Sequence, residues 1–132
     1  MFLKSIILIF LSSASLSLTN CADDPSLTGT WDCTLNTNQY GISSAIMNLN
    51  ENSGRVTGRF KWIDLDLLLD GTVNSNRQVN METHDSTHRC IFALRTLRDG
   101  TFLDGSFQHY MYISEIQATM HVDGGSLNAT KR

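Results

Sequence analysis

The chain has 132 residues, a formal net charge of −3 and 41% hydrophobic residues. This length suits one domain with one core, and the mildly acidic balance argues against nucleic acid as a partner. The sequence therefore indicates a small globular domain, and its N-terminal segment is the first feature to interpret.

The first 20 residues have the pattern of an export signal. A basic start that contains Lys4 precedes an apolar run, residues 5–18, which is too short to span a bilayer. Residues 18–21 are similar to a bacterial lipobox, which predicts lipidation of Cys21; the alternative is ordinary cleavage after Ala14. We expect an export signal at 1–20, a tether at 21–26, and a location in the periplasm or cell envelope (as an outer-membrane lipoprotein) or secretion. Membrane contact is expected only through this lipid anchor.

One five-residue pattern occurs four times: apolar, polar, glycine, polar, apolar. It covers residues 27–31, 56–60, 69–73 and 103–107. Such alternation is the period of a half-buried β-strand, and the glycine falls in phase with the apolar residues. Because glycine inside a strand marks a bend or a close backbone approach, the repeat favours a sheet that curls on itself.

Alternation and turn residues predict strands along the rest of the chain. A basic outer row in the third strand faces an acidic outer row in the fourth, which stabilises an antiparallel pair. Closure of the sheet removes exposed edges, so we predict an all-β, eight-stranded, antiparallel up-and-down barrel over residues 27–123. In the last strand Ile116, Ala118, Met120 and Val122 are expected inward, with a polar tail at 124–132. The predicted strands are 29–36, 43–50, 55–62, 64–73, 78–84, 88–97, 101–108 and 113–122.

Two cysteines are predicted on the inward face of their strands. In an oxidising compartment Cys33 and Cys90 would form a disulfide. It would stabilise the fold by about 4 kcal/mol by constraining the unfolded chain. The alternative is two buried free thiols.

No constellation of catalytic or metal-binding residues stands out. His84 and His88 flank a turn, and a zinc site needs further ligands that the neighbouring sequence does not supply. Nucleophile motifs and phosphate-binding glycine loops are absent from the sequence. We therefore expect no enzyme activity, no metal and no cofactor.

Residues 26–31, Ser-Leu-Thr-Gly-Thr-Trp, look like the opening of avidin-type barrels. The glycine–polar–tryptophan start is also the first-strand mark of lipocalins, and both families belong to the calycin group of small β-barrels. The resemblance implies that Trp31 packs across the closed end of the barrel. It does not extend to the biotin site, because Cys33 and Thr37 stand where avidins place asparagine and serine. Small periplasmic barrels that inhibit secreted metalloproteases are similar in architecture, and residues 21–26 would be their inhibitory segment.

The barrel interior is the remaining candidate site, because an eight-stranded barrel is either filled by its own side chains or holds one small ligand. We expect a mostly filled interior with a shallow pocket at the open end and Trp62 and Phe102 at its rim. This predicts an exported, non-catalytic barrel that binds a small apolar or amphiphilic molecule. The alternatives are a barrel that binds an extracytoplasmic protein, such as an inhibitor of a secreted hydrolase, and a structural lipoprotein. The expected ligand-binding residues are Trp31, Phe60, Trp62, Phe92, Phe102 and Phe107.

Overall fold

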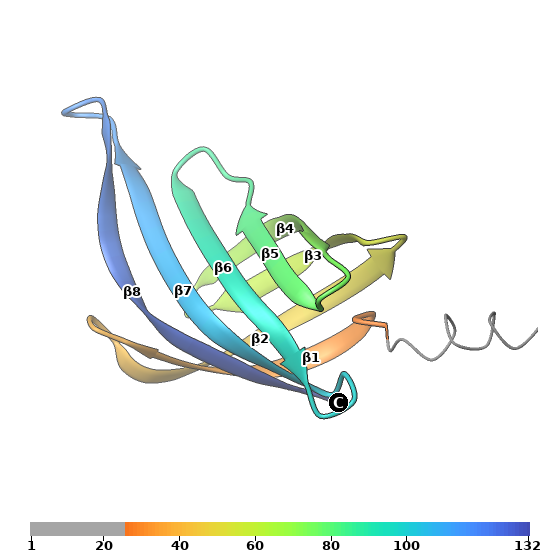
Figure 1. Ribbon diagram of the computed structural model, residues 1–132. Helices are drawn as coiled ribbons and strands as arrows, with labels where there is room; N and C mark the ends of the chain where they lie inside the picture. The colour runs from red at the N-terminus through yellow and green to blue at the C-terminus, as the bar shows by residue number, and fades with distance from the viewer. Residues whose placement is uncertain (1–25) are drawn as a thin grey trace, which may run out of the picture.

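A computed structural model describes residues 26–132; the expected export signal, Cys21 and most of the tether lie outside the described residues. Eight strands form a closed barrel in which each strand pairs antiparallel with the next and β1 pairs with β8 (Figure 1). This confirms the predicted fold class. Within residues 26–132 there is no helix long and apolar enough to cross a membrane. The strands are β1 (Gly29–Thr37), β2 (Gly41–Asn52), β3 (Arg55–Trp62), β4 (Leu65–Val73), β5 (Gln78–Thr83), β6 (His88–Leu97), β7 (Phe102–Ile113) and β8 (Ala118–Lys131).

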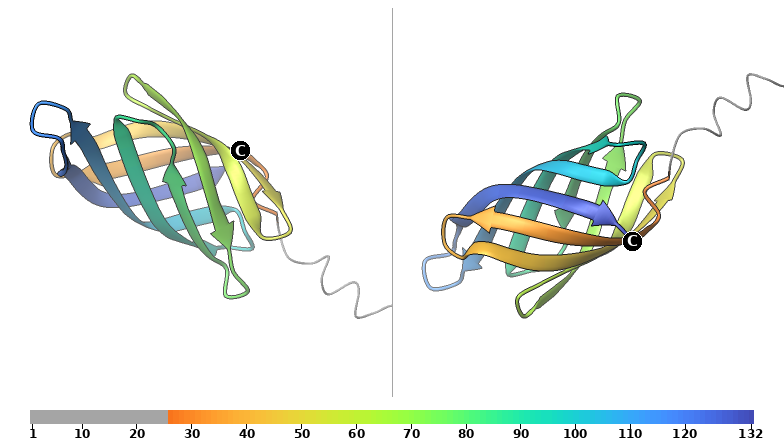
Figure 2. Two further views of the ribbon diagram at one scale, coloured as in Figure 1. Left: turned by 90° about the horizontal axis from the view of Figure 1, so that it is seen from above. Right: turned by 90° about the horizontal axis from the view of Figure 1, so that it is seen from below.

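Alternation places one set of side chains inside the barrel and the other in solvent. Two further views show that the strands are tilted around the barrel (Figure 2). The predicted charge rows of β3 and β4 face each other outside: Arg55 lies 2.9 Å from Asp70 and Arg59 lies 3.4 Å from Asp66. Exposed pairs of this kind contribute little stability each, so the core carries the fold.

The repeated glycines allow neighbouring strands to approach closely. A Cβ atom at Gly58 would collide with the backbone carbonyl oxygen of Asn48 on β2. Gly71 and Gly105 meet the carbonyl oxygens of Asn80 and Ala93 in the same way. The repeat therefore marks positions where the strand bends against its neighbour, as its inward phase predicted.

The last hairpin differs from the sequence-based expectation. β7 continues through the aromatic residues 109–112, and the turn lies at residues 114–117, where Gln117 has a φ of +50°. Figure 1 shows this long hairpin in blue. Ile116 is 57% exposed and Met120 is 50% exposed, so the expectation that both point inward is wrong. The sequence lacks a glycine or proline at this turn, and for that reason the pattern placed it too early.

The expected polar tail at 124–132 is also wrong, because most of it is the second half of β8. Residues 125–131 pair with β1 and close the barrel, and Leu127 and Ala129 are fully buried. Gly125 does not end a strand; its lack of a side chain lets β8 lie directly against the Asn36 carbonyl of β1. The predicted strand ends at residue 122, before this glycine pair, whereas β8 continues through the pair and uses Gly125 as a contact point.

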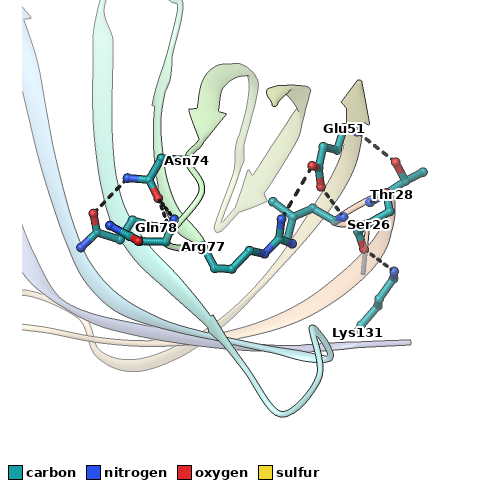
Figure 3. A network of polar contacts seen from close by, with 9 residues as sticks. Ser26, Thr28, Glu51, Asn74, Arg77, Gln78 and Lys131 are labelled. Atoms are coloured by element: carbon teal, nitrogen blue, oxygen red, sulfur yellow. Dashed lines mark hydrogen bonds and ion pairs between the residues drawn. The ribbon is translucent and has the colours of Figure 1, made fainter. Parts of the chain in front are cut away.

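The N-terminal segment closes the end of the barrel at which β1 begins, here called the Trp31 end. Leu27 is fully buried; its N–H donates to Glu51 Oε1 at 2.8 Å, and its carbonyl accepts from Trp31 Nε1 at 2.9 Å. Figure 3 shows the surrounding polar network, in which Lys131 Nζ donates to the Ser26 carbonyl at 2.9 Å. Trp31 therefore packs across a closed end, as the family resemblance implied.

The predicted disulfide between Cys33 and Cys90 is not formed: both thiols are free and buried. Cys33 pairs with Ala129 of β8 and Cys90 with His109 of β7, so β7 and β8 separate the two cysteines along the barrel wall. Burial, the largest cause, raises the pKa of each thiol to about 12. At neutral pH both side chains are therefore unreactive small hydrophobic groups.

We predict that Gly58→Ala lowers the free energy of unfolding by about 1–3 kcal/mol, because the added methyl group forces β2 and β3 apart. Urea unfolding followed by tryptophan fluorescence measures this. The control Asn50→Ala changes an exposed side chain on β2 and should stay within about 0.5 kcal/mol of the wild type. Equal stability of both variants would contradict the close approach.

A second prediction concerns the two free thiols. It is tested on the Cys21→Ser protein, purified without reductant, in which Cys33 and Cys90 are the remaining cysteines. A thiol reagent should detect both Cys33 and Cys90 after denaturation and neither within minutes in the native protein, because both are buried with raised pKa values. Detection of no thiol after denaturation would show that the two cysteines are oxidised.

Candidate functional site

The buried polar side chains gather at the end of the barrel opposite Trp31, here called the His109 end. Among residues 26–132 the buried polar or charged residues are Thr37, Thr83, His109 and Asp123, each at most 4% exposed. Thr37 and Thr83 are the last residues of β1 and β5, while His109 and Asp123 lie opposite each other on β7 and β8. Buried polar groups concentrated at one end are typical of a binding site.

Asp123 is a buried carboxylate of which only one oxygen accepts hydrogen bonds. Its Oδ1 accepts hydrogen bonds from the backbone N–H groups of Gln39 and Gly124, both at 2.9 Å. Burial raises its pKa, but the backbone hydrogen bonds from Gln39 and Gly124 help to outweigh this, so that the pKa lies below its usual value. The carboxylate is therefore ionised at neutral pH, and its Oδ2 is buried with no hydrogen-bond partner.

His109 is the second group with an unused polar atom. Its Nε2 lies 3.0 Å from Nδ1 of His88, and the two rings stack with centroids 5.3 Å apart. Burial is the main cause that lowers the pKa of His109; His88 and His121 lower it further, and Asp123 partly offsets them. His109 is thus neutral at pH 7. Its buried Nδ1 has no partner and is a donor or an acceptor according to which histidine holds the shared proton.

Aromatic rings and the β1–β2 turn surround these atoms. The Trp62 ring centroid lies 5.9 Å from that of His109 and 5.4 Å from that of Tyr40, both edge to face. The indole N–H of Trp62 donates to Ser43 Oγ at 2.8 Å, which fixes the ring. The turn, residues 38–40, covers Asp123 through the Gln39 bond and through Asn38, whose N–H donates to the Gly124 carbonyl at 3.1 Å.

The structure separates the aromatic residues that the sequence grouped as a ligand site. Phe60, Trp62, Phe92 and Phe107 form one cluster; ring centroids lie 4.9 Å apart for Phe60 and Phe92 and 5.1 Å apart for Trp62 and Phe107. All four are at most 1% exposed and fill the barrel below the His109 end.

Two further expected ligand residues lie at the other end. Trp31 belongs to the closed end, and Phe102 begins β7 there, half-buried beneath the Arg98 guanidinium at 4.5 Å. Trp62 and Phe102 therefore do not share a rim, which corrects that expectation. Trp62 alone of the two lies against the His109 end.

The sequence analysis did not identify His109, Thr83 and Asp123 as a site, although the alternation of the strands places His109 and Asp123 on the inward face. His109 continues the inward phase of Phe107, and Asp123 is in phase with Leu127 and Ala129. A polar residue at an inward position of a strand is the sequence signal that could have indicated this site. His88 contacts His109 rather than His84, and within residues 26–132 no three His, Cys, Asp or Glu side chains group as metal ligands.

A surface hollow of about 640 Å³ lies elsewhere, on the outer face of β2, β3 and β4. Arg55, Asp70 and His84 are among its lining residues, and these charges already pair: Asp70 lies 2.9 Å from Arg55 and 3.6 Å from His84. The hollow contains none of the buried unpaired atoms, so the His109 end is the stronger candidate.

Comparisons with known proteins support the fold. No protein-family model and no curated protein matches the sequence. The chain is similar to the bradavidin2–biotin complex, with a TM-score of 0.57 and 13% identity over 82% of this chain and 98% of that chain. For the rhizavidin–biotin complex these values are 0.53, 12%, 80% and 92%, and for EF1p2_mFAP2b bound to DFHBI they are 0.55, 15%, 80% and 94%. Together with the closed sheet, they confirm a calycin-like small β-barrel.

The lowered pKa of His109 predicts a loss of stability in mild acid. The unfolded chain, with its histidine pKa near 6.5, binds the proton more readily than the folded protein. The free energy of unfolding should therefore fall as the pH drops below about 6.5, by at most about 1.4 kcal/mol per pH unit for this group. His109→Gln should flatten this slope between pH 7 and pH 5 in urea titrations, whereas Asn50→Ala should keep it. An unchanged slope in His109→Gln would contradict the assignment.

Proposed function

We propose that this chain is a non-catalytic binding barrel whose site is the His109 end. The single observation that carries the proposal is the pair of unpaired, inward polar atoms there, Asp123 Oδ2 and His109 Nδ1. A buried polar atom without a partner costs about 1–3 kcal/mol, so native proteins retain few of them without a reason. A bound small molecule with hydrogen-bonding groups would satisfy both atoms.

The packing of the interior limits where that molecule sits. Phe60, Phe92 and Phe107 fill the centre, so the ligand occupies the end of the barrel and rests on Trp62. This favours a molecule with a polar head and a flat apolar surface over a purely apolar one. The ligand would reach this end of the barrel past the β1–β2 turn, because residues 38–40 are exposed and are held to β8 by few hydrogen bonds.

The remaining groups support binding rather than catalysis. Cys33 and Cys90 are buried thiols with pKa values of about 12, so neither is an activated nucleophile. The solved structures similar to this chain include complexes with biotin and with DFHBI, which supports a small-molecule ligand by analogy of fold.

Export to the envelope is part of the proposal and rests on the N-terminal pattern. The segment that follows Cys21 docks at the Trp31 end through Leu27 and Ser26. A lipid anchor at Cys21 would therefore place the membrane on the Trp31 side and the binding site on the side facing away. Of the inhibitory segment expected at residues 21–26, the structure describes only Ser26, whose carbonyl accepts a hydrogen bond from Lys131 Nζ.

The two tryptophans of the chain give a built-in test. In an NMR titration of the mature protein with a fragment library, a ligand at the proposed site should shift the indole N–H signal of Trp62 and leave that of Trp31 unchanged. Asp123→Asn should weaken binding about 10-fold or more, since a hydrogen bond to a charged group is lost. The matched control Asp99→Asn lies in the β6–β7 turn at the other end and should bind as the wild type does. Fragments that shift Trp31 alone, or that bind Asp123→Asn normally, would overturn the proposal.

A further inference from the structure

We propose that the ligand received at the His109 end is a small organic cation that carries N–H donors, such as a guanidinium or an amidinium. This inference rests on the proposed function and names the chemical class of its ligand. It follows from the charge around Asp123, from the charge of the whole end, and from the rings beside it.

Asp123 is a charge without a counter-charge. Among residues 26–132 the ion pairs leave Asp123 out; their acidic members are Asp32, Glu51, Asp66, Asp70 and Glu82. Its neighbour on β7, His109, is neutral at pH 7, because burial and His88 lower the pKa of that histidine. The two backbone N–H groups on Oδ1 stabilise the charge of Asp123 in part, and its Oδ2 remains free to accept from a positive partner.

The turns at this end add negative charge and no positive charge. Those at residues 38–40, 63–64, 84–87 and 114–117 contain no lysine or arginine, while Asp64, Asp85 and Glu115 each occupy one of them. Arg89 on the nearby outer face is neutralised by Glu82 at 3.1 Å. A surface that carries one sign of charge attracts ligands of the other sign.

The Trp31 end has the opposite character. Its turns carry Arg77 and Arg98 with one acidic residue, Asp99, and β8 ends at Lys131, which Arg132 follows. Arg77 and Arg132 pair with Glu51 and Asp32, whereas the ion pairs of residues 26–132 do not include Arg98 or Lys131. The barrel is thus polarised along its axis, and the acidic end is the one that holds the unpaired carboxylate. A cation is drawn to the His109 end and an anion is repelled from it.

The atoms available in the site match a planar cation. A charge-assisted N–H to carboxylate bond is about twice as strong as a neutral one, and Asp123 Oδ2 is free to accept it. His109 Nδ1 accepts a second N–H when Nε2 carries the histidine proton. Tyr40, which is 48% exposed and has its ring centroid 5.4 Å from that of Trp62, offers a ring surface that favours a cation over a neutral ring.

Two ring-shaped probe ligands of similar shape but different charge distinguish the effect of ligand charge on binding from the effect of ligand shape. The first probe is 2-aminoimidazolinium, a cyclic guanidinium; the second is imidazolidin-2-one, a neutral cyclic urea. Both are titrated into the mature wild-type protein, with the indole N–H signals of Trp62 and Trp31 as readout and calorimetry for affinity. We expect the cation to bind at least 10-fold more tightly, to shift Trp62 only, and to weaken as salt is raised.

The variants then test whether Asp123 carries the preference. Asp123→Asn keeps an acceptor for the β1–β2 turn and should remove the difference between the two rings, while Asp99→Asn should retain it. Should Asp123→Asn fail to fold, the ratio of the two affinities in the wild type and its salt dependence decide the question. Equal or tighter binding of the urea overturns this inference and leaves the proposed function standing. Absence of a Trp62 shift by either ring also overturns it, and the fragment library then decides the proposed function separately.

Discussion

The pairing of β1 with β8 is the constraint on which the rest of this structure depends. It closes the sheet from the Trp31–Lys131 pair to the Thr37–Gly125 pair and then stops. Just beyond that point, β8 has lost its β1 partner while its pairing with β7 continues. The β1–β2 turn takes the place of β1, and Asp123 receives the Gln39 N–H there. The candidate site is therefore located where the closing seam ends.

Closure also explains why the barrel interior leaves little room for a ligand and why the end of the barrel is the better candidate for a binding site. Glycines such as Gly58 let the strands coil tightly, and the narrow space inside is filled by interlocking rings around Phe60. Side-chain packing of this density leaves the ends as the places where polar groups can be buried. One end is sealed by Leu27 and its hydrogen bonds. At the other end, the polar atoms of Asp123 and His109 remain without partners.

The two ends thus differ in chemistry as well as in packing. Basic residues and the docked segment that begins at Ser26 gather at the Trp31 end, whereas the turns around His109 contain three acidic residues and no lysine or arginine. This polarity links the proposed anchor, the proposed site and the proposed ligand charge along one axis. The fold alone, which distant barrels share at 11–15% identity, does not specify such a ligand; particular side chains must do so.

The fold class, most strand boundaries and the charge rows on β3 and β4 could be predicted from the sequence, because alternation with period two depends only on which face of a strand is buried. The sequence also determined that Trp31 belongs to the core. The role of Gly125 depends on tertiary contacts, since a glycine that ends a strand and a glycine that permits contact have the same local pattern. Local sequence patterns likewise could not show that Cys33 and Cys90 stay unpaired, because this depends on how far apart β1 and β6 lie around the barrel. His109 and Asp123 became a site only through the β7–β8 register, which brings together residues that are distant in the chain.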